Sequence, residues 1–240
     1  MTLFWLDHII FLIVGIVIPL LSLFSASQTS STQEGETVKV ELPPKKHLYY
    51  SNGLMLWIGA SLVLTSWNYS QKPWSLLGIQ YPQFSTLSWY LIAALLLIYL
   101  VDTAYSTFKA VRDKTPDDEE FLSIMPANWK EYAHFVFLAC SAGVCEEVVF
   151  RGFLINYIHE SIPIDQYSMI LSVLIPGIIF SVSHIYQGFL NVFKIFSLSL
   201  LFGSIFLLTK SLVVVIILHI FVDMLSGAVF VVLQKRKQHQ

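Results

Sequence analysis

Charged side chains are scarce in this sequence: Asp, Glu, Lys and Arg make up 12% of its 240 residues. Ordinary soluble domains carry about 25%, while hydrophobic residues here reach 55%. This shortage of charge disfavours a soluble all-helical protein. The sequence also has no basic cluster of the kind that binds nucleic acid, so no nucleic-acid partner is expected.

Cysteine is equally rare, with only Cys140 and Cys145 in the chain. The two lie five residues apart in one predicted helix and point in different directions, which disfavours a disulfide between them. They form no metal-binding motif by themselves, and the HExxH pattern of zinc peptidases is absent. Neither pattern therefore indicates a metal ion or another cofactor.

The chain does contain repeated apolar runs close to the length that crosses a bilayer, which is about 20 residues for a helix. We predict an all-α, polytopic membrane bundle of about seven transmembrane helices. The predicted spans are Phe4–Phe24, Asn52–Trp67, Leu87–Phe108, Tyr132–Ile158, Tyr167–His184, Phe189–Leu208 and Ser211–Leu233.

Basic residues in the loops predict the orientation, because cytoplasmic loops are enriched in Lys and Arg. With seven spans, one side holds Lys39, Lys45, Lys46, Lys109, Arg112, Lys114, Lys130, Lys235, Arg236 and Lys237, while the other holds Lys72 and Lys210. The C-terminus is therefore expected in the cytoplasm. We divide the chain into N-terminal spans and loops, residues 1–125, and a C-terminal core with a short basic tail, residues 126–240.

Several charged residues fall inside predicted spans: Glu146, Glu147, Arg151 and Asp223. A charge in the middle of a bilayer costs roughly 2.5–3.5 kcal/mol on insertion scales. These side chains are therefore expected to face the interior of the bundle and to find partners there. Ionisable groups in such positions are candidates for function.

Helical geometry separates the two adjacent glutamates. Glu147 and Arg151 are four residues apart with the acid first, the favourable order for an ion pair on a helix. Glu146 lies about 140° from Arg151 around an α-helix, since each residue turns about 100°. We expect Glu147 and Arg151 to form a structural ion pair and Glu146 to be turned away from it, towards two histidines of other spans.

Those histidines are His184 and His219, and each belongs to a pair at helical spacing. Phe180 and His184 share one face of the fifth span, and His219 and Asp223 share one face of the seventh. His184 is expected near the cytoplasmic end of its span, whereas Glu146 is nearer the middle of its own.

Other polar residues receive simpler interpretations. Asp7 and His8, near the end of the first span, are expected to reach interfacial water. Asp102 lies within the third span, and Lys194 is long enough to extend its ammonium group towards the cytoplasmic surface.

The motifs Glu146-Glu147-x-x-x-Arg151, Phe180-x-x-x-His184 and His219-x-x-x-Asp223 resemble, in this order and one per helix, those of the CAAX protease and bacteriocin-processing family, also called Abi. The resemblance covers roughly residues 130–233. It implies an intramembrane glutamic endopeptidase that needs no metal, acts on hydrophobic or lipidated peptides, and resides in a membrane such as the bacterial cytoplasmic membrane.

The resemblance further implies that Glu146 activates water with the help of His184, and that His219 and Asp223 stabilise the oxyanion. Because an ionised Asp223 would repel an oxyanion, we favour His219 as the donor and Asp223 as its orienting partner.

Three alternatives remain open. Two histidines and a carboxylate also suit Zn²⁺, with a second glutamate as base. A non-enzymatic immunity or scaffold protein could use the same residues to hold helices together or to bind a peptide. A proton-coupled transporter would need ionisable groups that connect both faces of the membrane.

Overall fold

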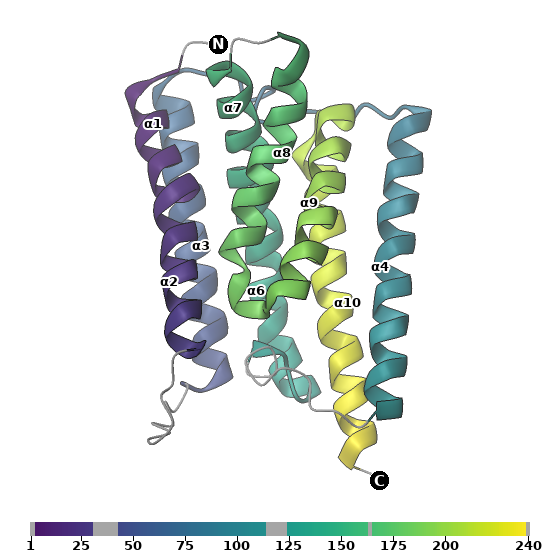
Figure 1. The fold of residues 1–240 in the computed structure, drawn as a ribbon. Coiled ribbons are helices and arrows are strands. Elements are labelled where there is room, and N and C mark those ends of the chain that lie inside the picture. The colour runs from purple at the N-terminus through teal and green to yellow at the C-terminus, as the bar shows by residue number, and fades with distance from the viewer. Residues whose placement is uncertain (1–2, 31–42, 114–123, 163–164, 239–240) are drawn as a thin grey trace.

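The computed structural model describes residues 3–30, 43–113, 124–162 and 165–238. Within these ranges the chain is helical and has no strand. The helices run up and down in a single bundle (Figure 1). They are α1 (Trp5–Leu12), η1 (Ile13–Val17), α2 (Ile18–Ser30), α3 (Lys45–Tyr69), α4 (Thr86–Asp113), α6 (Trp129–Glu146), η2 (Glu147–Leu154), α7 (Ile155–Ser161), α8 (Asp165–Ser183), η3 (Ile185–Gln187), α9 (Phe189–Thr209) and α10 (Leu212–Gln238).

The predicted all-α membrane bundle is confirmed, and the chain is an integral, multi-pass membrane protein. Five helical runs of the described residues are long and apolar enough to cross a membrane: Trp5–Phe24, Thr86–Lys109, Trp129–Ser161, Phe189–Thr209 and Leu212–Arg236. The other two predicted spans are also helices, but α8 is shorter and α3 is less apolar. The start of α1 and the end of α10 lie at opposite ends of the bundle (Figure 1).

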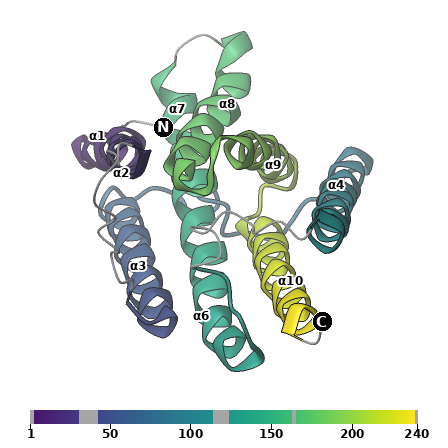
Figure 2. The same cartoon turned by 60° about the horizontal axis from the view of Figure 1, so that its bottom comes forward.

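One continuous helical column, α6–η2–α7, occupies the centre of the bundle. It packs against α3, α8, α9 and α10, and Figure 2 shows these helices around it. Its Gly143 and Gly152 allow the closest approaches, because a side chain at either position would collide with Ile220 of α10 or Leu77 of the α3–α4 connection. The column therefore brings residues of four helices to its middle.

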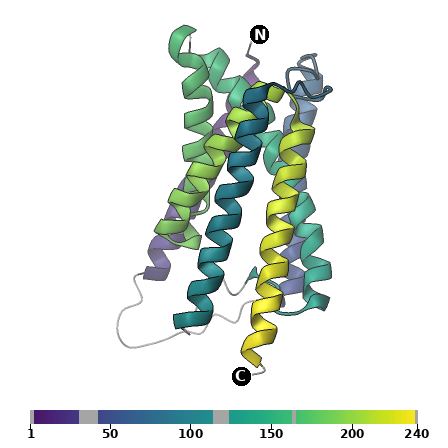
Figure 3. The ribbon, with the colours of Figure 1, turned by 90° about the vertical axis from the view of Figure 1, so that its right-hand side faces the viewer.

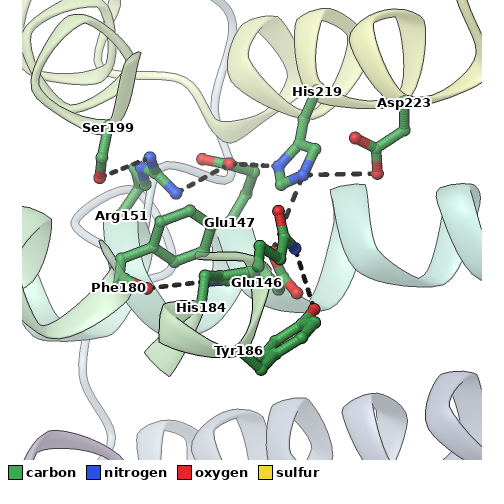
Figure 4. A network of polar contacts seen from close by, with 10 residues as sticks. Glu146, Glu147, Arg151, Phe180, His184, Tyr186, Ser199, His219 and Asp223 are labelled. Carbon is green, nitrogen blue, oxygen red and sulfur yellow. Dashed lines mark hydrogen bonds and ion pairs between the residues drawn. The ribbon is translucent and has the colours of Figure 1, made fainter. Parts of the chain in front are cut away.

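The helices α8 and α9 form a hairpin that reaches only part of the way along the bundle. Figure 3 shows their connection ending well above the lower ends of α4 and α10. His184 is the first residue after α8, and Gly188 closes the connection with a positive φ of 90° that favours glycine. The short hairpin thus places His184 inside the bundle, beside Glu146 at the junction of α6 and η2 (Figure 4).

A buried ion pair fastens the upper end of the bundle. The side chains of Asp7 in α1 and Lys72 after α3 are 1% and 4% exposed, and the Lys72 ammonium donates to Asp7. The prediction that Asp7 reaches interfacial water is wrong, because the chain supplies a buried cation instead. His8, on the same turn, contacts the Tyr157 hydroxyl through Nδ1 at 2.8 Å.

Candidate active site

The central column changes its winding at the two glutamates. Glu146 is the last residue of α6, and Glu147 begins the π-helical segment η2, in which Ile155 donates its backbone N–H to Phe150 five residues earlier. π-helical segments within α-helices are rare and are frequently found at functional sites. The wider turn also changes the angles between successive side chains, so the 100° steps of an α-helix do not describe this stretch.

Hydrogen-bond acceptors and aromatic rings surround the guanidinium group of Arg151. Its Nη1 donates to Oε1 of Glu147 at 3.0 Å, and its Nη2 donates to Oγ of Ser199 in α9 at 3.1 Å. The guanidinium group also stacks between two aromatic rings, 5.0 Å from the centre of Phe180 and 5.2 Å from that of Phe202. The expected contact between Glu147 and Arg151 is thus present, and a hydroxyl and two rings support it.

Glu147 has a second partner that the helical angles did not indicate. Its Oε1 also lies 2.7 Å from Nδ1 of His219 in α10 (Figure 4). A carboxylate oxygen accepts, so Nδ1 carries the hydrogen of this bond. Glu147 is therefore not turned away from the histidines: it joins Arg151 to His219.

The other nitrogen of His219 faces two further carboxylates. Nε2 lies 3.8 Å from Oε2 of Glu146 and 3.7 Å from Oδ2 of Asp223. The Glu146 side chain is 15% exposed, whereas that of Glu147 is fully buried. Glu146 is thus the less constrained of the two glutamates, and part of its side chain is accessible.

His184 approaches the same place from the α8–α9 hairpin. Its Nδ1 lies 2.7 Å from the carbonyl oxygen of Phe180. Because a carbonyl only accepts, Nδ1 is the donor, and Nε2 is left as the acceptor of the neutral ring. Figure 4 shows His184 beside Glu146, with Tyr186 next to both.

The structure therefore gathers Glu146, His184, His219 and Asp223, which we call the candidate cluster, around the middle of the central column (Figure 4). Direct contacts connect His219 with Glu146 and Asp223, while His184 is placed by its backbone bond. Within the described ranges, no group of three or more His, Cys, Asp or Glu side chains has an arrangement that could hold a metal ion.

Sequence reasoning missed Ser199, Phe202 and Tyr186. A buried guanidinium group requires hydrogen-bond acceptors besides one glutamate. This requirement predicts a further polar partner for Arg151 but does not say which residue it is. The sequence of α9 contains other serines, including Ser197 and Ser204, so nothing in it distinguished Ser199 from them.

Comparison with known families agrees with this geometry. Residues 128–225 match the family model described as type II CAAX prenyl endopeptidase Rce1-like. This segment, less than half of the chain, is similar to the Rce1-like family. The matched residues include α6, the candidate cluster and about the first half of α10. The chain has no match among curated proteins or among solved structures.

The match to this family indicates a membrane protease, a hydrolase of peptide bonds of the CAAX protease type. The family resemblance seen in the three sequence motifs is thereby confirmed. The assignment of the individual residues of the candidate cluster remains a prediction, as does the division of the chain at residues 125 and 126.

Proposed function

We propose that this protein is a glutamate-dependent intramembrane endopeptidase in which Glu146 is the general base. The observation that carries the proposal is the difference between the two adjacent glutamates. Glu147 is buried and bound by both Arg151 and His219, whereas Glu146 is partly exposed and faces His219 without a short bond. Only Glu146 is free to bind and deprotonate a water molecule.

In this mechanism a water molecule lies between Glu146 and Nε2 of His184. Glu146 removes one of its protons as the oxygen attacks the carbonyl carbon of the scissile peptide bond. The tetrahedral intermediate then collapses, the C–N bond breaks, and Glu146 returns the proton to the leaving amine. A positioned general base of this kind contributes about 10²–10⁴-fold to the rate.

His219 is placed to stabilise the negative charge that develops on the carbonyl oxygen. Its Nδ1 is held by Glu147, so the ring can turn Nε2 only towards the space that Glu146 and Asp223 share. Both ring nitrogens face carboxylate oxygens, an arrangement that suits a ring with hydrogens on both. We assign Asp223 to orienting and balancing this ring, and Nε2 to donating to the oxyanion.

The proposed substrate is a hydrophobic or lipidated peptide or protein that reaches the site from the bilayer. The position of the candidate cluster at the middle of the central column, among helices long and apolar enough to cross a membrane, supports this class. We also propose that the C-terminus is cytoplasmic in a bacterial cytoplasmic membrane. The starts of α3 and α6 and the end of α4 lie at the same end of the bundle as the end of α10 (Figure 1). These helix ends carry Lys45, Lys46, Lys130 and Lys109, in agreement with the positive-inside rule, whereas Lys39 and Lys114 are outside the described residues.

The test is cleavage by purified Glu146→Gln protein in lipid or detergent. We expect at least a 100-fold loss of the cleavage rate with unchanged thermal unfolding. Glu160→Gln, at the far end of the same column, is the matched control and should keep full activity. A Glu146→Gln protein that folds and cleaves like the wild type would contradict the role of Glu146 as general base, whereas a folded wild-type protein that cleaves no peptide would favour the non-enzymatic scaffold.

The zinc peptidase is the second candidate by residue type alone, because a glutamate and two histidines are common zinc ligands, although the described residues are not arranged to hold a metal ion. Prolonged treatment with a strong chelator, followed by assay in metal-free buffer, separates the two mechanisms. The glutamate mechanism predicts full activity, whereas loss of activity that Zn²⁺ restores would establish the metal mechanism.

A further inference from the structure

Tyr186 lies beside the candidate cluster without a part in the reaction proposed above. It belongs to η3 (Ile185–Gln187), the short 3₁₀ turn that joins α8 to α9. Figure 4 shows its hydroxyl group pointing towards the Glu146 carboxylate. Its ring also stacks on that of His184, with 6.0 Å between the ring centres and 30° between the ring planes. A hydroxyl group therefore lies next to both residues that are proposed to activate water.

Hydrogen bonds at both ends of η3 fix the position of Tyr186. The backbone N–H of Gln187 donates to the carbonyl of His184 at 3.0 Å. The side-chain amide of Asn191, in the first turn of α9, donates to the carbonyl of Gln187 at 2.6 Å. Since His184 immediately precedes η3, the same turn sets the position of the histidine and of the tyrosine at the site.

The hydrogen bond between Tyr186 and Gln187 defines the role of the tyrosine hydroxyl. Nε2 of Gln187 donates to this hydroxyl at 3.0 Å, so the phenol oxygen is the acceptor of the bond. A phenol retains its hydrogen at neutral pH, and here this hydrogen is directed to an acceptor other than the Gln187 amide. A hydrogen bond received from an amide also polarises the hydroxyl and makes it a stronger donor. Tyr186 therefore has the properties of a proton donor at the site.

Tyr186 and His219 approach Glu146 from opposite sides (Figure 4). Nε2 of His219 lies 3.8 Å from Oε2 of Glu146 and is the proposed donor to the carbonyl oxygen of the scissile bond. In the tetrahedral intermediate this oxygen and the amide nitrogen are different substituents of one carbon atom, so they point in different directions. With His219 at the oxygen, the nitrogen is directed to the other side, where Tyr186 lies.

The leaving nitrogen needs a proton when the C–N bond breaks. An amine leaves as a neutral molecule and not as an anion, so a group within hydrogen-bond reach has to supply the proton. In the proposed reaction Glu146 carries the proton that it has taken from water, while it also faces His219. A hydroxyl group next to Glu146 on the side of the nitrogen shortens the path of this proton.

We propose, on the basis of the function proposed above, that Tyr186 is a further catalytic residue, the general acid that protonates the leaving amine. As the C–N bond breaks, the Tyr186 O–H proton passes to the nitrogen and the oxyanion re-forms the carbonyl group. The phenolate then takes from the Glu146 carboxyl group the proton that Glu146 had removed from water. Both side chains return to their starting forms, and one water molecule is consumed for each peptide bond.

Tyr186→Phe tests this role, because it removes the proton donor and keeps the ring that stacks on His184. The probes are an internally quenched farnesylated CAAX peptide and the same peptide with a thioester in place of the scissile amide. A thiolate leaves without a proton, since an ordinary thiol has a pKa of about 8.5. The general acid is thus needed for the amide and not for the thioester.

We expect Tyr186→Phe to lower kcat for the peptide about 100-fold with KM unchanged, and to lower kcat for the thioester less than about threefold. Gln187→Leu, which removes the donor to the phenol oxygen, should lower kcat for the peptide by a smaller factor. Tyr167→Phe, at the exposed start of α8, is the matched control and should change neither rate.

Equal losses with both probes would show that Tyr186 supports only the geometry of the site, and no loss with either would show that it takes no part. Both results overturn the proposal. Failure of the proposed function appears separately, in Glu146→Gln, because water must be activated whichever group leaves. If Glu146→Gln cleaves both probes like the wild type, the base assignment fails. A folded wild-type protein that cleaves neither probe would contradict the peptidase and the role of Tyr186 together.

Discussion

Nδ1 of His219 lies 2.7 Å from Oε1 of Glu147, the same oxygen that accepts from Arg151 at 3.0 Å. The second glutamate of the motif therefore links a buried arginine on the central column to a histidine on α10. This contact leaves Nε2 of His219 directed towards Glu146 and Asp223. The ion pair and the proposed oxyanion donor are thus parts of one network.

Arg151→Met tests this network directly. It leaves the Glu147 carboxylate buried without its cation, which typically costs about 3–5 kcal/mol. We expect a lower unfolding temperature and a lower kcat, because His219 loses its fixed position. Adding Glu147→Gln should restore much of the stability but not kcat. A single variant as stable as the wild type would contradict the role assigned to the ion pair.

Ser199→Ala tests the support of Arg151 from α9. It removes the acceptor for Nη2 of Arg151 and should cost about 1 kcal/mol of stability, with a moderate fall in kcat. The matched control is Ser197→Ala, since the exposed Ser197 hydroxyl bonds only to the carbonyl of Phe193 in its own helix among the contacts described. Equal effects at both serines would remove Ser199 from the network.

Gly143→Ala tests the close approach of α6 and α10. A Cβ at position 143 would lie 2.5 Å from Cγ1 and 3.1 Å from the backbone nitrogen of Ile220, next to His219. The helices must separate, which should cost roughly 1–3 kcal/mol. Displacement of His219 from Glu146 by an ångström would lower kcat about 100-fold.

Gly59→Ala provides the comparison for that substitution, because a Cβ at position 59 meets nothing within 4 Å. It should leave both kcat and the unfolding temperature unchanged. If Gly143→Ala behaved in the same way, the spacing of α6 and α10 would not matter for the reaction.

Much of the fold could be predicted from the sequence because hydrophobic runs of membrane length have few alternatives in a bilayer. The motifs at i, i+4 spacing also indicated which helices meet. The contact of Glu147 with His219 could not be predicted, since the angular argument assumed an α-helix and η2 is π-helical. The ion pair of Asp7 could not be predicted either, because its partner Lys72 lies in a loop 65 residues later in the chain.

Asp223→Asn and Asp223→Leu test the orienting role of Asp223. Asparagine keeps an acceptor for His219 Nε2 but loses the charge, so we expect kcat to fall roughly tenfold. Leucine removes both properties, and kcat should fall by about 10²–10³, the loss seen when oxyanion stabilisation fails. Full activity of Asp223→Asn across the whole pH range would show that no charge is needed at this position.

The most direct measurement of the central claim compares the membrane proteomes of cells that express the wild-type protein or Glu146→Gln at equal levels. If Glu146 is the catalytic base, at least one membrane peptide or protein will accumulate in its uncleaved form with the variant, and its cleaved form will disappear. Identical proteomes, with the wild-type protein folded and inserted, would contradict the assignment of Glu146 as the base of an intramembrane peptidase.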